Sequence, residues 1–148
     1  MKRCDLFLDA SALVAYFNIE DEFHEQASEI IDTEELDLNL YTSDITLLEL
    51  QYVLWKKVDL VTAVDKTMGL IEAEDVTVLT SEMDDIFNEL EIFKLHPMPS
   101  FDAIICAIMN RYGIELLVSF DREHFDAVNG IKRAETLKEL KAKIRNVH

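Results

Sequence analysis

The feature that most constrains the fold is a short apolar run, CDLFL at residues 4–8, which ends directly at Asp9. A nearly continuous apolar run of this length is typical of a strand buried on both faces of a parallel sheet. In open parallel sheets the ligand crevice lies at the carboxyl ends of the strands, which is where Asp9 would lie. Two interpretations stay open: Asp9 and Ser11 cap the next helix, or Asp9 holds a metal or a phosphate ester.

Predicted strands and helices alternate along the rest of the chain. Further strands are expected at residues 36–42, 76–79 and 116–119, with an edge strand near Ile131. Apolar residues at helical spacing predict helices at 11–17, 21–33, 45–57, 61–73, 82–93, 101–112 and 134–145. This alternation predicts a single α/β domain over residues 1–148. It would have three layers (α/β/α) around a central, mostly parallel sheet of four to five strands.

Local signals add detail to three of these helices. Ser81 and Ser100 are expected to be N-caps, and Gly113 a C-cap. The helix at 101–112 is apolar nearly all round and should be central and buried. The helix at 82–93 should pack through its apolar side, which consists of Met83, Ile86, Phe87, Leu90 and Phe93.

The charge is strongly acidic and unevenly distributed. The chain has 14 Lys and Arg against 30 Asp and Glu, a net charge of −16, although residues 132–148 are basic. An acidic body argues against non-specific nucleic-acid binding, which depends on neutralising phosphates, and favours divalent cations or a basic partner. The basic segment is the one place where a polyanion could be held without a metal.

The composition also bears on the cellular compartment. The two cysteines are expected to be buried free thiols in a reducing cytoplasm, without a disulfide or a zinc site. No apolar run is long enough to span a membrane, and the N-terminus leads straight into the first strand without a signal peptide. We therefore expect a cytoplasmic protein without a membrane partner.

Two acids besides Asp9 stand at the start or end of a buried element. Asp121 follows the strand at 116–119 as Asp9 follows the first strand, and its alternative role is that of a turn residue. Asp102 opens the most apolar helix, so both helix capping and an inward-pointing ligand remain open for it.

Glu49 is a fourth informative acid. At 100° per residue it falls inside the apolar sector of the helix at 45–57. A carboxylate buried there is costly unless it is paired or bound to a metal, and Lys56 is the alternative partner. Four acids in one crevice would repel one another, and a divalent cation removes that conflict. Oxygen ligands without Cys or His favour Mg²⁺ or Mn²⁺.

Three stretches of the chain resemble the PIN-domain ribonucleases, which include the toxins of toxin–antitoxin pairs. They are LFLDASALVAYF, ITLLELQYVL and PSFDAIICAIMNRYGIELLVSFDREHF. The resemblance implies a compact α/β/α domain with a metal-dependent endonuclease site. The acids that match the family's site residues are Asp9, Glu49, Asp102 and Asp121.

The resemblance also implies roles for neighbouring residues. Ser11 and Ser119 match positions beside the first and fourth acids, where a side chain would act as a helix cap or hold a metal-bound water or a phosphate. The family often has a further acid after the fourth, for which Glu123 and Asp126 are candidates, and His124 has no assigned role.

The activity implied is Mg²⁺- or Mn²⁺-dependent hydrolysis of RNA phosphodiester bonds. Asp9, Asp102 and Asp121 would be the main metal ligands. Glu49 would bind a second ion, or it would orient or deprotonate the attacking water. The partners implied are an RNA substrate, an antitoxin and a second copy of the chain. Trp55 and Phe93 would permit such a homodimer, although a core position is the simpler interpretation of both.

The basic segment is a candidate contact for the RNA backbone, with a solvated helix face as the alternative. Its residues are Lys132, Arg133, Lys138, Lys141, Lys143 and Arg145.

Two other classes of protein remain as alternatives. One is a catalytically silent PIN-like module that binds protein partners. The other is a phosphohydrolase of the haloacid dehalogenase type, which needs an acid two residues after its nucleophilic Asp, where this chain has Ser11.

Overall fold

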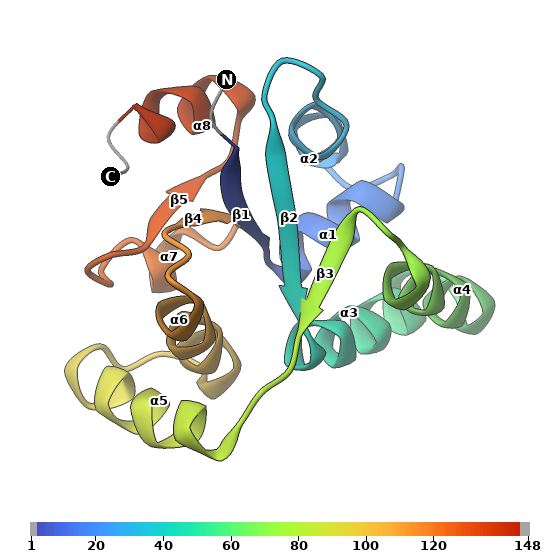
Figure 1. The fold of residues 1–148 in the computed structure, drawn as a ribbon. Helices are drawn as coiled ribbons and strands as arrows, with labels where there is room; N and C mark the ends of the chain where they lie inside the picture. Colours follow the sequence, from blue (N-terminus) through green and yellow to red (C-terminus); the bar gives the residue numbers. More distant parts are fainter. Residues whose placement is uncertain (1–2, 146–148) are drawn as a thin grey trace.

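The computed structural model describes residues 3–145, which form a five-stranded, all-parallel sheet in the order β3-β2-β1-β4-β5 (Figure 1). The strands are β1 Cys4–Leu8, β2 Leu38–Ser43, β3 Val76–Leu79, β4 Leu116–Val118 and β5 Lys132–Ala134. The run at residues 4–8 is therefore the central strand, and the edge strand expected near Ile131 is β5. The prediction of a parallel α/β sheet of four to five strands is confirmed.

Helices cover both faces of the sheet, as Figure 1 shows. They are α1 Ala10–Phe17, α2 His24–Ile31, α3 Asp44–Lys57, α4 Leu60–Glu72, α5 Met83–Leu95, α6 Ser100–Tyr112, α7 Arg122–Phe125 and α8 Leu137–Ile144. The single-domain prediction covers residues 1–148, of which 1–2 and 146–148 lie outside the described residues.

The core divides into two clusters because successive strand residues point to opposite faces. Leu6 and Leu8 of β1 pack in one cluster with apolar residues of α1 to α4 and α8. Phe7 packs in the other cluster, mainly against α6, eight of whose residues are buried. The strand is therefore buried on both sides, which is the basis of the three-layer fold.

The helix caps in the structure match the caps predicted from the sequence only in part. Gly113 ends α6 with a φ of 69°, a left-handed conformation that glycine adopts without strain. Ser100 is the first residue of α6 rather than its cap, which is Pro99. The prediction that Ser81 is the N-cap of α5 is wrong, because Glu82 takes that position. Ser81 instead donates hydrogen bonds from its N–H and its hydroxyl to the carboxylate of Asp44.

The orientation of α5 is opposite to the expected one. Asp85 and Glu89 are buried, and Asp85 accepts hydrogen bonds of 2.8 and 2.9 Å from the guanidinium of Arg111. The side expected to pack inward is exposed: Met83, Ile86, Phe87, Leu90 and Phe93. The charge-assisted pair with Arg111 fixes which side of α5 faces α6, and an apolar surface is left uncovered.

A second apolar surface lies on α3 and α4. A groove of about 380 Å³ is lined by Leu48, Gln51, Tyr52, Trp55, Leu60, Ala63 and Val64. Trp55 is 49% exposed and Phe93 43% exposed, so the core interpretation of these two side chains is wrong. Within residues 3–145 no single helix is long and apolar enough to cross a membrane; α5 and α6 together reach that length but are bent by 117°.

Candidate active site

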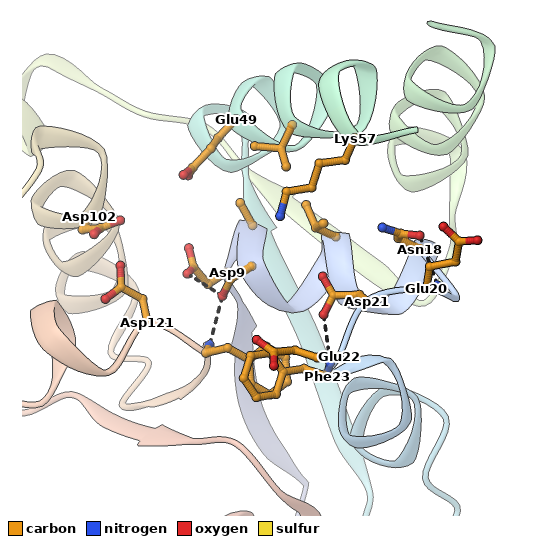
Figure 2. Close-up of a pocket in the computed structure, with 15 residues that line it drawn as sticks. Asp9, Asn18, Glu20, Asp21, Glu22, Phe23, Glu49, Lys57, Asp102 and Asp121 are labelled. Carbon is orange, nitrogen blue, oxygen red and sulfur yellow. Dashed lines mark hydrogen bonds between the residues drawn. The ribbon is translucent and has the colours of Figure 1, made fainter. Parts of the chain in front are cut away.

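The four acids singled out from the sequence line one cavity of about 580 Å³ at the carboxyl edge of the sheet (Figure 2). Asp9 follows β1 and Asp121 lies just beyond β4, its neighbour in the sheet. Asp102 is in the first turn of α6, and Glu49 lies on the cavity side of α3. Figure 2 shows these side chains gathered at one end of the cavity.

Their ligand atoms are close enough to share an ion. One oxygen each of Asp9, Glu49 and Asp102 lies within 4.8 Å of the others, and so do ligand atoms of Asp102, Asp121 and His124. Asp102 belongs to both groups, so it joins them. Residues from β1, α3, α6 and the segment after β4 thus converge on one point.

Asp9 does not act as a cap through its side chain. It occupies the N-cap position of α1 but makes no side-chain capping hydrogen bond. Its Oδ2 accepts hydrogen bonds from Ser119 at 2.8 Å and Ser11 at 3.2 Å. Its Oδ1 is buried and has no partner among the described residues. A buried carboxylate oxygen left unpaired is costly, which indicates that something is missing from its surroundings.

Glu49 shows the same feature. Its Oε2 is buried and without a partner among residues 3–145. The alternative pair with Lys56 is not formed, because that ammonium lies 4.2 Å from the ring centroid of Trp55. The apolar sector of α3 therefore carries a carboxylate into the cavity, and no ion pair joins Glu49 to a cation within residues 3–145.

Burial and mutual repulsion raise the pKa values of these acids. Burial raises the pKa of Glu49 to about 7, with further contributions from the charges of Asp9, Asp102 and Asp121. Burial and the charges of Asp9 and Asp121 raise the pKa of Asp102 to about 6, against the opposing effect of His124. Burial also raises the pKa of Asp9, although the bonds from Ser119 and Ser11 oppose it. The cluster is therefore short of positive charge.

His124, which had no assigned role, bridges two of the acids. Its Nδ1 lies 2.6 Å from Asp102 Oδ2 and 2.7 Å from Asp121 Oδ2. Burial lowers the pKa of His124, but its hydrogen bond to Asp102 and the charge of Asp121 outweigh it, so the net pKa is raised. The three-residue spacing between Asp121 and His124 on one short helical turn was the available sequence signal.

The two serines organise the strand ends. Ser119 bonds Asp9 and also accepts a hydrogen bond of 3.1 Å from the N–H of Asp121. Ser11 accepts a bond of 3.0 Å from the N–H of Phe120. Together they tie the residues after β1 to the residues after β4, which places two acids side by side.

The basic segment lies elsewhere, since none of its residues lines the cavity. Arg133 is bonded to Asp126, Glu135 and the carbonyl of Ser119, and its side chain is only 10% exposed. Lys141 pairs with Glu35, which precedes β2 and so lies toward the amino end of the sheet. Contact of this segment with RNA stays a prediction. The ion pairs of Arg133 argue against such a contact for its guanidinium.

The donor set fits a divalent cation. Asp9 and Glu49 line the cavity, each has one buried carboxylate oxygen without a partner among residues 3–145, and Asp102 offers a ligand oxygen within 4.8 Å of both residues' ligand oxygens. Hard oxygen ligands of this kind suit Mg²⁺ or Mn²⁺, and the imidazole of His124 lies close to two of the acids. Asp9, Glu49, Asp102 and Asp121 are the residues that could hold it.

The family model of the PIN domain matches residues 6–131, which span all four acids. The chain belongs to the PIN domain family. The resemblance found in the sequence is thereby confirmed. A search of curated proteins gave no match.

Solved structures of PIN-domain toxins share the fold. VapC20 of Mycobacterium tuberculosis, a toxin that cleaves the sarcin–ricin loop, has a TM-score of 0.70 at 22% identity, covering 78% of this chain and 89% of its own. A toxin–antitoxin complex from Klebsiella pneumoniae has a TM-score of 0.67 at 17% identity, and the match covers 85% of this chain and 94% of that chain. VapBC2 of Rickettsia felis, bound to a promoter DNA fragment, has a TM-score of 0.64 at 16% identity, and the match covers 88% of this chain and 97% of that chain.

Proposed function

We propose that this PIN domain is a metal-dependent endoribonuclease and the toxin of a toxin–antitoxin pair. The observation that carries the proposal is the pair of buried, unpartnered oxygens, Asp9 Oδ1 and Glu49 Oε2, inside a cluster of carboxylates. Structural acids normally find hydrogen-bond partners, whereas these are left facing a cavity. The activity of VapC20, the structural neighbour, supports RNA as the substrate.

In the proposed mechanism Asp9, Asp102 and Asp121 would hold the divalent ion, and their carboxylate oxygens favour Mg²⁺ or Mn²⁺. When bound, the ion stabilises negative charge on the phosphoryl oxygens. Glu49, which lines the same cavity and has one buried oxygen without a partner among residues 3–145, would accept a proton from the attacking water. Water then displaces the 3′-oxygen, which breaks the P–O3′ bond. Ser11 and Ser119 keep Asp9 in position through its Oδ2.

The test is RNA cleavage by Asp9→Asn, with Asp84→Asn, an exposed acid of α5, as the matched control. We expect Asp9→Asn to lower Mg²⁺- or Mn²⁺-dependent cleavage by at least about 100-fold with an unchanged circular dichroism spectrum, and Asp84→Asn to keep full activity. Cleavage by Asp9→Asn at the wild-type rate would refute the assignment. A wild-type chain whose melting temperature does not rise with Mn²⁺ would favour the silent binding module instead.

The antitoxin and a second copy of the chain are the proposed protein partners. The complexes from Klebsiella pneumoniae and Rickettsia felis support the first. Two exposed apolar surfaces, on α3–α4 and on α5, would be covered by these partners. Light scattering of the chain alone and with the product of an adjacent small gene tests both. The proposed RNA substrate supports a cytoplasmic location.

A further inference from the structure

The cavity continues well beyond the four acids. Its outer part is lined by the loop between α1 and α2, by Phe120 and by the last turn of α3. A volume of about 580 Å³ is within the range of pockets that enclose small organic ligands, whereas metal ions need only the deep end. The outer part therefore has room for a portion of the substrate.

One wall of this outer part carries an unpaired cation, Lys57. Among residues 3–145 it is the only basic residue that lines the cavity, against seven acids. Figure 2 shows its side chain reaching into the cavity from α3. No ion pair joins Lys57 to another residue within 3–145, although acids are abundant nearby. An ammonium held free at the edge of a phosphodiester-cleaving site is suited to a backbone phosphate.

The opposite wall carries an aromatic pair. Phe23 and Phe120 stack face to face, with ring centroids 4.5 Å apart and an interplanar angle of 5°. Both line the cavity and neither is fully buried. Aromatic rings in such positions provide stacking surfaces for unpaired bases, without a strong preference for one base.

The acids of the loop between α1 and α2 affect how a nucleotide would lie in the outer cavity. Glu20, Asp21 and Glu22 line this same outer part of the cavity; in Figure 2 Glu22 lies next to Phe23, whereas Glu20 lies next to Asn18. They would repel a phosphate but not a base, whose N–H groups can donate to carboxylates. A nucleotide in the outer cavity therefore places its phosphate toward Lys57 and its base toward Phe23.

We propose that the outer cavity is a subsite for one unpaired ribonucleotide next to the scissile phosphate, whose own phosphate binds Lys57 and whose base stacks on the Phe23–Phe120 pair. This inference rests on the proposed function and specifies its substrate as single-stranded RNA. A base inside a duplex is stacked between its neighbours and cannot enter the subsite.

The test measures binding of fluorescein-labelled hexauridylate by anisotropy, with Ca²⁺ in place of Mg²⁺ and gels to verify that the RNA stays intact. Phe23→Leu should weaken binding about fivefold to 100-fold, while Phe23→Tyr, which keeps an aromatic ring, should bind like the wild type. Phe87→Leu, an exposed phenylalanine of α5, is the aromatic control and should have no effect. The Tyr variant separates stacking from packing, because a folding defect would affect both substitutions.

Lys57 is tested through the salt dependence of the same binding. Lys57→Gln should reduce the slope of log K against log salt by about 0.7, the value for one phosphate contact on a single strand, and Lys94→Gln on α5 should leave it unchanged. A 12-base-pair duplex should not compete with hexauridylate.

The outcomes separate the two proposals. The subsite alone is overturned if the wild type cleaves RNA but Lys57→Gln leaves the salt slope of binding unchanged. It is also overturned if the wild type cleaves RNA but Phe23→Leu and Phe23→Tyr bind hexauridylate equally well. Binding that depends on both residues in a chain that cleaves no RNA supports the subsite and overturns the nuclease. A wild-type chain that binds no single-stranded RNA overturns both.

Discussion

The hydroxyl of Ser119 donates a hydrogen bond of 2.8 Å to Oδ2 of Asp9 and so joins the ends of two neighbouring strands. The same hydroxyl accepts from the N–H of Asp121 at 3.1 Å. One buried oxygen therefore positions two acids of the site. It also favours the charged form of Asp9, since its bond lowers a pKa that burial raises.

The first prediction concerns this hydroxyl. Ser119→Ala removes a bond to the carboxylate, so the pKa of Asp9 should rise further and Mn²⁺ affinity at pH 7 should fall about tenfold or more. Ser119→Thr keeps the hydroxyl and serves as the matched control. Isothermal titration with Mn²⁺ measures both variants. Equal affinity of Ser119→Ala and the wild type would show that the bond does not tune the site.

The second prediction concerns the pH dependence of stability without metal. The pKa values of Glu49 and Asp102 are raised to about 7 and about 6, above the ordinary values of 4.5 and 3.8 for these side chains. The folded protein thus holds protons that the unfolded chain has released, and this stabilisation is lost as the pH rises through 6 and 7. The free energy of unfolding should fall by roughly 1–2 kcal/mol between pH 5 and pH 8, after allowance for solvent screening.

Urea unfolding with EDTA measures this loss, and saturating Mn²⁺ should abolish it because a cation stabilises the charged carboxylates. Glu49→Gln, which cannot ionise, should show a shallower decline than the wild type. An identical decline in that variant would mean that Glu49 does not titrate in this range.

The convergence of the four acids on one cavity could be predicted because they stand at the ends of buried elements or on an apolar helix face. Asp9 and Asp121 end apolar strands, and parallel strands end at the same edge of a sheet. Glu49 interrupts the apolar sector of a helix, where solvation cannot explain it. These are local patterns, and the topology that unites them follows from the alternation of strands and helices.

Other parts of the site depend on packing between distant segments. The stacking of Phe23 on Phe120 joins residues far apart in the sequence, and nothing in either segment indicates it. The orientation of α5 was wrong for the same reason, because the buried pair of Asp85 with Arg111 outweighs the apolar periodicity of the helix. Hydrophobic pattern alone cannot indicate which face of a helix a partner will cover.

The third prediction concerns His124, whose imidazole bridges Asp102 and Asp121. His124→Ala should destabilise the metal-free protein by roughly 1.5–3 kcal/mol, the usual value of a hydrogen bond to a charged group. Because the pKa of His124 is raised, the stabilisation is present below its ordinary value of 6.5 and is lost as the pH rises through the folded value. The penalty should therefore be larger at pH 6 than at pH 9.

Urea unfolding of metal-free protein at the two pH values measures this difference. His96→Ala is the control, since no side-chain hydrogen bond joins His96 to another residue in the described range. A pH-independent penalty for His124→Ala would indicate a packing role in place of the charged bridge.

The fourth prediction decides between a structural role and RNA contact for Arg133. Its guanidinium bonds Glu135 at 2.8 Å, Asp126 at 2.7 Å and the carbonyl of Ser119 at 2.9 Å. Arg122 also binds Glu135, and these contacts lower the pKa of the Glu135 carboxyl despite its burial. Arg133→Gln removes one partner of a largely buried ion pair, so we expect a destabilisation of roughly 3 kcal/mol at pH 7.

Lys141→Gln is the matched control from the same basic segment. Its pair with Glu35 is exposed, so the change in unfolding free energy should stay below about 1 kcal/mol. Chemical denaturation gives both values, and hexauridylate binding is measured on the same samples. If Arg133→Gln is as stable as the wild type but binds RNA more weakly with a smaller salt slope, the guanidinium is a backbone contact. The expected result, lost stability with an unchanged salt slope, assigns Arg133 to holding the strand end on which Ser119 stands.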